Sequence, residues 1–522
     1  MLSPLDPPAD PPPSHVVAFM DIGSNSVRLL LVRINPNQTY TVLTEQKEVV
    51  RLGETVFVDG RLHPTAIRRT ANACQDFVSL ARARGATEII AVATSATREA
   101  KNQAEFLRTL KRQVGLDVRV ISGKEEARLI YLGTSHVARK EDGQALFIDI
   151  GGGSTELAIG DQKQYAYLDS LRLGAIRLSE MFHLDADGPI SKKHYDRVCD
   201  YVRDTAAPTF KRIQRFRIGQ FIGSSGTIEN LADILYRVRY DRRRDRSDVM
   251  RHSELAKIID LLFSLSLDDR RAVPGINPER ADIIVGGAAI VDVFMDELDL
   301  PEIHPTDRGM RDGLLLDYLA NSEHADFYGG VPIRDRSVLQ LARACGSDEA
   351  HTRVVARLAT ELFDSARKLD VHRYGAEERD LLAFAAFLHD VGAFLSYDNQ
   401  NEHAWYLISS ADLLGFNRTE IGIIAALAFF SRKGFPKRGH PKLEGLDPSS
   451  QNVVRTLTAF LRIADGLDRS RRGLVEHARL LKGRDGLVLH IKARGDATTD
   501  RWGVQYNNPA IEKLLGRRVI ME

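Results

Sequence analysis

The sequence predicts an α/β protein in which two duplicated domains are followed by a helical domain and a small C-terminal α+β segment. Three observations support this fold class. Strand-like and helix-like segments alternate over the first 320 residues, as in layered α/β architectures. A motif near the N-terminus returns 128 residues later. Long helical patterns then dominate residues 335–478, before strand-like sequence returns at 486–493 and a short helix closes the chain.

The first domain opens with a predicted hairpin. Residues 16–34, VVAFMDIGSNSVRLLLVRI, contain two β-rich runs around a Gly-Ser-Asn-Ser turn. An amphipathic pattern predicts a helix over 64–84, and a strand at 88–94 precedes a helix over about 101–114. This order is the pattern of one α/β domain.

The second domain is predicted from an internal repeat. FIDIGGGSTELAIG (147–160) repeats AFMDIGSNSVRLLLV of the first hairpin, each with a polar loop between apolar strands. The matched pairs are Asp149 and Asp21, Gly151 and Gly23, and Ser154 and Ser26. Two similar halves predict an active cleft between the copies.

We place the main domain boundaries near residues 138 and 320. The predicted domains are 15–138, 139–320, 321–478 and 479–522. The first 14 residues contain six prolines and no apolar surface to bury, which predicts an extended, disordered tail, 1–14.

Composition excludes several classes of protein. Hydrophobic residues make up 43% of the 522 residues and charged residues 27%, which is the balance of a globular protein. The formal charge is +1, so the chain is no polycation and we expect no nucleic-acid partner. Cys74, Cys199 and Cys345 show no CxxC spacing, which excludes a cysteine metal knuckle and fits a reducing cytosol. The apolar run 421–430 is half the length that crosses a bilayer, so we expect a cytoplasmic protein without an integral membrane segment.

Four glycine-rich segments predict phosphate binding. Besides the two repeated loops, FIGSSGTIENLADIL (221–235) passes from a strand to a helix, and IIVGGAAIVDVFMDEL (283–298) runs into another helix. A glycine turn lets several backbone N–H groups point into one concavity, and such concavities bind anions. The alternative is that these segments are purely structural turns. Four such loops at strand ends favour phosphate binding over this alternative.

Two acids beside the second loop predict a divalent cation. Asp149 precedes the GGG run, and Glu156 follows Ser154 and Thr155. Carboxylates beside a phosphate cradle would repel the substrate unless a hard cation lay between them, and Mg²⁺ suits this role. The alternatives are a loop hydrogen bond for Asp149 and a solvent-facing strand position for Glu156.

A third acid, Glu126, is separated from its neighbour by helix geometry. Ser122 and Glu125 have the spacing of a capping box, which predicts a helix running through Leu132. Glu126 then points about 100° away from Glu125 around the helix and is free to activate a water as general base. Interaction with the helix dipole is the alternative. Arg98 adds a side chain of the type that binds phosphate bidentately.

These motifs together resemble one protein family. DIGSNS, TSATREAKN, SGKEEARLIYLG, DIGGGSTEL and GSSGTIENL occur in the order and spacing of the exopolyphosphatase/guanosine pentaphosphate phosphohydrolase (Ppx/GppA) family. The resemblance covers nearly the whole chain. It implies two actin-like domains of the acetate and sugar kinase/Hsp70/actin fold that hold phosphate and Mg²⁺ in their cleft. It also implies hydrolytic release of orthophosphate from the end of a phosphoanhydride chain.

The resemblance implies roles for individual residues of this chain. Glu126 would be the catalytic acid, and Asp149 and Glu156 would be tied to Mg²⁺ and water. The residues that would bind phosphate are Asp21, Ser24, Asn25, Arg98, Gly151, Gly152, Gly153, Ser154, Gly223, Ser225, Gly226 and Thr227.

The helical domain carries a second set of ligand-type residues. His351, His389, Asp390 and Asp465 have the order and rough spacing of an HD-domain metal site. In the family this region resembles an HD domain that is often degenerate. A relic packed by polar hydrogen bonds is therefore the alternative to a working metal site.

The leading expectation is an exopolyphosphatase that uses Mg²⁺ to hydrolyse inorganic polyphosphate. Residues 431–522 carry 19 Lys and Arg against 10 Asp and Glu, and this excess fits either a solvated surface or a track for the polyanion, including Arg432 and Arg471. The alternatives are removal of the 5′-terminal phosphate of guanosine pentaphosphate, and a sensor that binds polyphosphate or an alarmone without hydrolysis. We also expect a homodimer, for which the C-terminal domains provide surface.

Overall fold

The computed structural model describes residues 14–522 apart from 37–38, 139–142, 185–187, 246–247, 322–330, 412, 414 and 485. The chain divides into two compact units, and the boundary between them in the sequence lies between residues 330 and 331. The predicted Pro-rich tail, 1–14, lies outside the described residues except for Ser14. The predicted boundary near 138, inside the first unit, stays a prediction.

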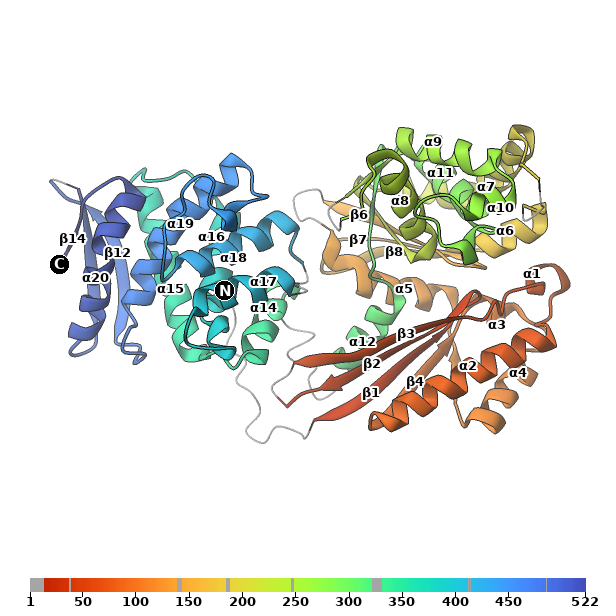
Figure 1. Ribbon diagram of the computed structural model, residues 1–522, viewed down its shortest axis with the longest axis horizontal. Coiled ribbons are helices and arrows are strands. Elements are labelled where there is room, and N and C mark those ends of the chain that lie inside the picture. The colour runs from red at the N-terminus through yellow and green to blue at the C-terminus, as the bar shows by residue number, and fades with distance from the viewer. Residues whose placement is uncertain are drawn as a thin grey trace. The chain divides into compact units, whose positions relative to one another are not determined.

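The first unit contains two α/β lobes (Figure 1). The first sheet has the strand order β3-β2-β1-β4-β5. Its strands are β1 (His15–Ile22), β2 (Ser26–Ile34), β3 (Tyr40–Val49), β4 (Ala86–Ala93) and β5 (Val118–Val120). β1 and β2 form the predicted antiparallel hairpin, and β4 runs parallel to β1.

Helices accompany this sheet. They are α1 (Val56–Asp59), α2 (Pro64–Ala83), α3 (Ser95–Glu99) and α4 (Gln103–Thr109), which continues into the π-helical turn η1 (Leu110–Val114). The predicted helices at 64–84 and about 101–114 are confirmed, whereas two short helices, α1 and α3, were not predicted. α2 begins cleanly because the His63 side chain accepts a hydrogen bond from the Thr65 N–H, and Pro64 occupies the first turn.

The second sheet repeats the first with one added edge strand, in the order β10-β11-β9-β6-β7-β8. Its strands are β6 (Gln144–Ile150), β7 (Thr155–Gly160), β8 (Tyr165–Leu171), β9 (Ile218–Ser224), β10 (Met250–Arg251) and β11 (Glu302–Pro305). β6 and β7 form the second hairpin, and β9 runs parallel to β6 as β4 does to β1. The predicted duplication is confirmed.

The core of the second lobe forms because β6 is apolar on both faces. Leu146 and Ile148 pack with Phe210 and Phe294, whose rings meet edge to face 4.8 Å apart. Phe147, on the opposite face, packs against Tyr131. The helices of this lobe are α6 (Ala175–Phe182), α7 (Lys192–Ile213), α8 (Ser225–Tyr240), α9 (His252–Ser264), α10 (Leu267–Arg271), η3 (Pro278–Arg280) and α11 (Ile284–Glu297).

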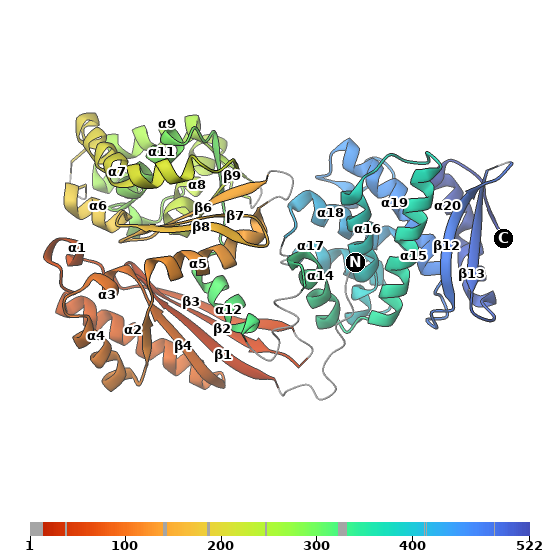
Figure 2. The same cartoon turned by 180° about the vertical axis from the view of Figure 1, so that it is seen from behind.

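Two further helices cross where the lobes meet (Figure 2). α5 (Gly123–Thr134, followed by the turn η2, Ser135–Val137) packs on β7 and β8, whereas α12 (Met310–Ala320) packs on β1. A Cβ on Gly313 would lie 1.8 Å from the Leu129 carbonyl oxygen, and one on Gly133 would lie 2.1 Å from the Gly309 carbonyl oxygen. The two helices therefore touch backbone to backbone, which only glycine permits.

The fourth predicted glycine loop is wrong, because Gly286 and Gly287 lie within α11. A Cβ on Gly287 would lie 2.4 Å from Thr227 Cγ2, and one on Gly286 would lie 3.0 Å from the Ala175 carbonyl oxygen. These glycines bring α11 close to its neighbours and form no anion-binding turn. Only three of the four predicted loops are loops at strand ends.

The second unit is helical and carries a small sheet. Its helices are α14 (Ile333–Ala344), α15 (Glu349–Lys368), α16 (Ala376–Leu388), η4 (Val391–Phe394), α17 (Gln400–Ser410), α18 (Arg418–Phe430), η5 (Pro441–Leu443), α19 (Pro448–Gly466) and α20 (Thr498–Leu515). The sheet has the order β12-β13-β14, formed by β12 (Val475–Lys482), β13 (Leu487–Ala493) and β14 (Val519–Met521).

This unit confirms a helical domain followed by a small α+β segment. The predicted strand at 486–493 is β13. The closing element differs from the prediction: α20 spans 18 residues, and the strand β14 follows it. The predicted boundary between 478 and 479 falls inside β12. Across the described residues, every helix is too short or too polar to pass through a membrane.

Candidate active site

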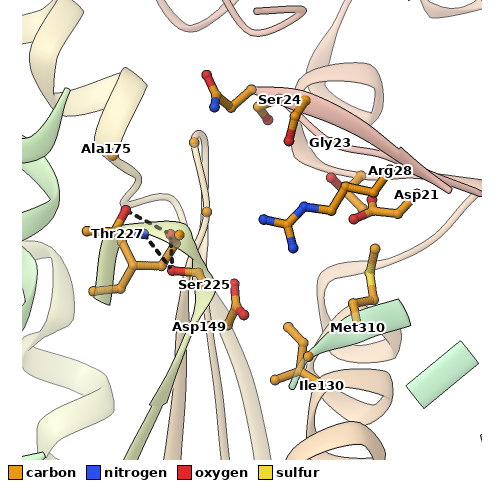
Figure 3. Close-up of a pocket in the computed structure, with 18 of the residues that line it drawn as sticks. Asp21, Gly23, Ser24, Arg28, Ile130, Asp149, Ala175, Ser225, Thr227 and Met310 are labelled. Atoms are coloured by element: carbon orange, nitrogen blue, oxygen red, sulfur yellow. Dashed lines mark hydrogen bonds between the residues drawn. The ribbon is translucent and has the colours of Figure 1, made fainter. Parts of the chain in front are cut away.

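The two repeated loops line one cleft between the lobes (Figure 3). Its wall includes residues 23–26 of the first loop, 151–154 of the second, and 225–227 at the start of α8. Glu126 of α5 lines the same cleft, as do Asp21 and Asp149. The structure therefore brings together most of the residues that the sequence singled out.

The two loops share one backbone geometry. The Gly23 N–H donates to the Ser26 carbonyl oxygen at 3.0 Å, and the Gly151 N–H donates to the Ser154 carbonyl oxygen at 2.9 Å. Neighbouring segments fix both turns: the carbonyl oxygen of residue 24 accepts from Gly53, and that of residue 152 accepts from Ile176.

The amides inside these turns are available to a ligand. Those of Ser24, Asn25, Gly152 and Gly153 donate to no residue that the structure describes. The Asn25 side chain is also buried, with neither its nitrogen nor its oxygen hydrogen-bonded to a described residue. Unused donors gathered on a cleft wall suit an anion rich in oxygen atoms.

The third loop turns sharply from β9 into α8. Ser225 has a φ of +89°, and its hydroxyl donates to the Ile150 carbonyl oxygen at 2.8 Å. Gly226 lies against Arg280, since a Cβ at this position would be 2.2 Å from Nη2. Gly223, however, is buried inside β9, where a Cβ would meet Ile303 at 2.5 Å. It does not line the cleft, and its predicted phosphate contact stays a prediction.

Asp149 and Asp21 occupy equivalent positions at the ends of β6 and β1. Asp149 Oδ2 accepts a hydrogen bond from the Ser224 hydroxyl at 2.5 Å, and burial raises the pKa of Asp149. Asp21 Oδ1 is buried and has no hydrogen-bond partner among the described residues. Burial raises the pKa of Asp21 to about 6, while the charge of Arg28 opposes the shift. Both carboxylates are thus costly to ionise without a cation nearby.

Glu126 and Glu156 form a second pair of buried acids. Burial raises the pKa of Glu126 to about 7, although Arg98 counteracts it. Glu156 lies opposite Asp149 in the β6–β7 ladder and accepts from the Ser170 hydroxyl at 2.9 Å. Burial and the charge of Glu126 raise its pKa well above the usual range. Glu156 is only 1% exposed, so the solvent-facing alternative is wrong.

The start of α5 explains why Glu126 and its neighbour differ. The Ser122 hydroxyl accepts from the Glu125 N–H at 3.2 Å, as predicted for an N-cap. The Glu125 carboxylate does not close the capping box but accepts two hydrogen bonds from Arg128, each 2.9 Å long. Glu125 is thereby held on the outer face, while Glu126 is buried on the cleft face.

Arg98 does not itself line the cleft, and its predicted phosphate contact stays a prediction. Its Nη1 donates to Glu126 Oε2 at 3.0 Å and to the Ile121 carbonyl oxygen at 2.9 Å. The guanidinium therefore fixes the orientation of the Glu126 carboxylate.

Four basic side chains that line the cleft were not predicted from the sequence: Arg28, Arg280, Arg308 and Arg311. Arg308 is paired with Asp312 at 2.6 Å, and Arg311 with Glu45 at 3.1 Å. Arg28 and Arg280 form no ion pair with any residue in the described part of the chain. Burial lowers the pKa of Arg280 to about 10. Arg28 was detectable, because it occupies the repeat position of Glu156; Arg280 lies in no motif.

Comparison with known proteins settles the family. A model described as Ppx/GppA phosphatase family matches residues 30–322, and one described as Ppx/GppA phosphatase, domain III, matches residues 333–501. The chain belongs to the Ppx/GppA phosphatase family. Membership implies a hydrolase of phosphoanhydride bonds.

The relatives of this Ppx/GppA protein include enzymes that are named for two different substrates. A guanosine-5′-triphosphate,3′-diphosphate pyrophosphatase of Aeromonas hydrophila subsp. hydrophila is 29% identical over 487 residues, 92% of each chain. An exopolyphosphatase from Cytophaga hutchinsonii is 25% identical with a TM-score of 0.55, over 59% of this chain and 99% of that one. The Aquifex aeolicus family member is 27% identical with a TM-score of 0.50, over 60% and 100%. These solved structures agree with the predicted actin-like fold.

The helical unit, which contains the domain III match, brings its predicted residues together. One ligand-type atom each from His351, His389 and Asp465 lies within 4.8 Å of the other two. Asp390 lies beside them and accepts from Arg432 at 2.7 Å and from Arg471. These two arginines, predicted as part of a polyanion track, are therefore engaged with Asp390.

Proposed function

We propose that this Ppx/GppA protein is an exopolyphosphatase that hydrolyses the terminal phosphoanhydride bond of inorganic polyphosphate, with Glu126 as general base. The observation that carries the proposal is the position of Glu126: buried, fixed by Arg98, and lining the same cleft as two loops with unused amides. The Glu126 carboxylate therefore lines the same cleft as the groups that would bind an anion.

The chain's own groups account for substrate binding. The amides at positions 24, 25, 152 and 153 hold oxygens of the terminal phosphate. Arg28 and Arg280, which have no ion-pair partner among the described residues, add charge-assisted hydrogen bonds to the following phosphates. This arrangement orients the terminal P–O bond towards Glu126.

Glu126 then removes a proton from the attacking water. Its pKa of about 7 lies near neutral pH, where a general base is both ionised and able to hold the proton. Because Arg98 holds Oε2, the Oε1 atom is the one that receives the proton. The electron pair of the broken P–O bond passes to the shortened chain, and orthophosphate is released.

The acids of the cleft fit a divalent cation, for which we propose Mg²⁺. Six carboxylates but only four guanidinium groups line the wall, and Asp21 Oδ1 is buried without a partner among the described residues. Asp149 would hold the ion, and Asp21 lines the same cleft; Glu156, the second predicted ligand, is buried opposite Asp149 on β7 and does not itself line the cleft. When bound, Mg²⁺ supplies charge that stabilises the phosphate oxygens during hydrolysis.

The lining favours polyphosphate over a nucleotide. Among the described lining residues there is no aromatic side chain, and the apolar ones are Ile130, Ile150, Ala175, Ile283 and Met310. A purine base gains affinity by stacking on aromatic rings, whereas a phosphate chain needs only donors and cations. Guanosine pentaphosphate is the second candidate, because the Aeromonas relatives carry that activity in their name.

We further propose a cytoplasmic homodimer, to be tested by fractionation and light scattering.

The test compares adjacent glutamates on both substrates. Phosphate release from long-chain polyphosphate and from guanosine pentaphosphate is measured for the wild type, Glu126→Gln and the matched control Glu125→Gln. We expect Glu126→Gln to lower kcat about 10²–10⁴-fold, Glu125→Gln to change it little, and EDTA to abolish activity until Mg²⁺ is restored. Turnover of Glu126→Gln equal to the wild type removes Glu126 from the mechanism. Binding of polyphosphate by the wild type without any phosphate release would identify a sensor instead.

A further inference from the structure

Helices of the second unit bring two imidazoles and two carboxylates to one buried point. His351 lies in the first turn of α15, His389 directly follows α16, and Asp465 lies near the end of α19. Asp390 adds one oxygen 3.4 Å from His389 Nε2 and another 3.9 Å from His351 Nε2. The side chains of both histidines are at most 2% exposed.

Each imidazole is oriented by an acceptor on its outer side. His389 Nδ1 lies 2.7 Å from the Ala386 carbonyl oxygen, and His351 Nδ1 lies 2.8 Å from Asp468 Oδ2. A carbonyl oxygen only accepts, so His389 Nδ1 carries a proton, and the carboxylate of Asp468 favours the same state of His351. In a neutral ring, Nε2 is then the atom with the free lone pair. Metal-binding histidines are oriented in this way.

The inner nitrogens of the two rings differ, because His389 Nε2 is within hydrogen-bond distance of a carboxylate oxygen and His351 Nε2 is not. His351 Nε2 is buried and has no hydrogen-bond partner among the described residues; Asp465 Oδ1 is 3.6 Å from it. The same Asp465 oxygen lies 3.2 Å from His389 Nε2. Two carboxylates beside the inner nitrogens of two rings require positive charge at this point, either protons on the rings or a cation among the four side chains.

We propose that His351, His389, Asp390 and Asp465 bind one divalent transition-metal ion of the Zn²⁺ type. Two imidazole nitrogens and two carboxylate oxygens are a donor set that suits Zn²⁺ in four-coordinate geometry, whereas Mg²⁺ prefers oxygen ligands alone. The ion joins α15, α16 and α19, so its first role is to stabilise the helical unit.

The surroundings of Asp390 fit this role. Arg432 Nη2 and Gln400 Nε2 donate to Asp390 Oδ1 at 2.7 and 2.9 Å, and Arg471 donates to Oδ2. These donors fix the carboxylate and offset part of its negative charge. Binding of the ion would displace any proton on the two inner ring nitrogens and balance the charge of the two carboxylates.

The test is the metal content of the full-length protein, purified without a polyhistidine tag and measured by mass spectrometry. We expect about one transition-metal ion per chain in the wild type. His351→Gln and Asp465→Asn should each lose it, whereas the control His490→Gln, at an exposed histidine of β13, should keep it. Asp149→Asn should also keep it, which separates this site from the cleft. Equal metal content in all variants overturns the proposal.

A titration of the wild type keeps the proposal testable if the variants do not fold. Metal-free protein with unchanged circular dichroism is titrated with Co²⁺, whose visible bands report nitrogen and oxygen ligands. We expect bands that saturate at about one equivalent and disappear when Zn²⁺ is added. Folded protein that binds neither ion holds a histidine–aspartate ion-pair cluster instead, and the metal proposal is then wrong.

Discussion

The β1–β2 and β6–β7 hairpins place equivalent residues on the two walls of the cleft, and they differ most in charge. Both loops are closed by the same glycine-to-serine hydrogen bond, and both follow an aspartate. Seven residues after that aspartate, the first hairpin has Arg28 and the second has Glu156. The duplicated backbone has thus been kept while the side-chain chemistry has diverged.

The difference extends across each sheet. Asp21, Arg28 and Lys47 are register neighbours on β1, β2 and β3. Burial, with the charges of Arg280 and Arg28, lowers the pKa of Lys47 to about 8, which marks this row as crowded with cations. The equivalent row of the second lobe is Asp149, Glu156 and Ser170. We infer that the first lobe mainly binds the anionic chain and that the second mainly holds the groups that act on its end.

The largest effect is expected from the equivalent aspartates. Asp149→Asn should lower kcat about 10²–10³-fold, because it removes the charge beside Glu126 and Glu156 while the amide oxygen can still accept from Ser224. Asp21→Asn should have a roughly tenfold smaller effect, since its charge lies beside Arg28. Steady-state phosphate release measures both, and equal losses would contradict the division between the lobes.

An intermediate effect is expected at the position where the repeats differ. Arg28→Gln should raise KM about 10–100-fold with little change in kcat, because a charge-assisted contact to the substrate is lost. Glu156→Gln should instead lower kcat with little change in KM. Kinetics over a range of polyphosphate concentrations separate the two parameters. If both variants change the same parameter, the two rows have no separate roles.

The smallest effect is expected from adding a methyl group to the second loop. In Gly153→Ala, the new Cβ would lie 2.1 Å from Phe57 Cζ and 2.4 Å from Ser95 Oγ, which should cost about 1–3 kcal/mol of stability. Gly151→Ala is the control, because its nearest neighbour is 3.2 Å away. Thermal midpoints of the ligand-free proteins measure the difference. Equal midpoints would show that the second loop does not pack tightly against the first lobe.

Local sequence was sufficient to predict the two hairpins and helix α5. It also predicted that Asp21, Glu126 and Asp149 lie in one cleft. Apolar runs around a short polar turn specify a hairpin, and a repeated motif places its two aspartates at equivalent strand ends. The Ser122 cap also placed Glu126 correctly, since cap and helix period are local properties.

Tertiary packing decided the features that sequence analysis missed. Arg280 reaches the cleft only because the segment before α11 lies against Gly226. Gly286 and Gly287 resemble a glycine-rich loop in sequence but allow close helix packing. The sequence alone does not distinguish these two uses of glycine. Arg98 has the chemistry of a phosphate ligand, and its hydrogen bond to Glu126 depends on tertiary structure that the sequence does not show.

The glycine contact between α5 and α12 limits how far a movement of one lobe can displace Glu126, the proposed general base. Glu126 precedes Leu129, the contact point, by three residues, or about 4.5 Å along the helix axis. A swing of one lobe about this point by roughly ten degrees would displace the Glu126 backbone by less than about 1 Å. Groups of the moving lobe that lie farther from this contact would shift more during the same swing. On the proposed mechanism, substrate would then enter and leave the cleft without realignment of Glu126.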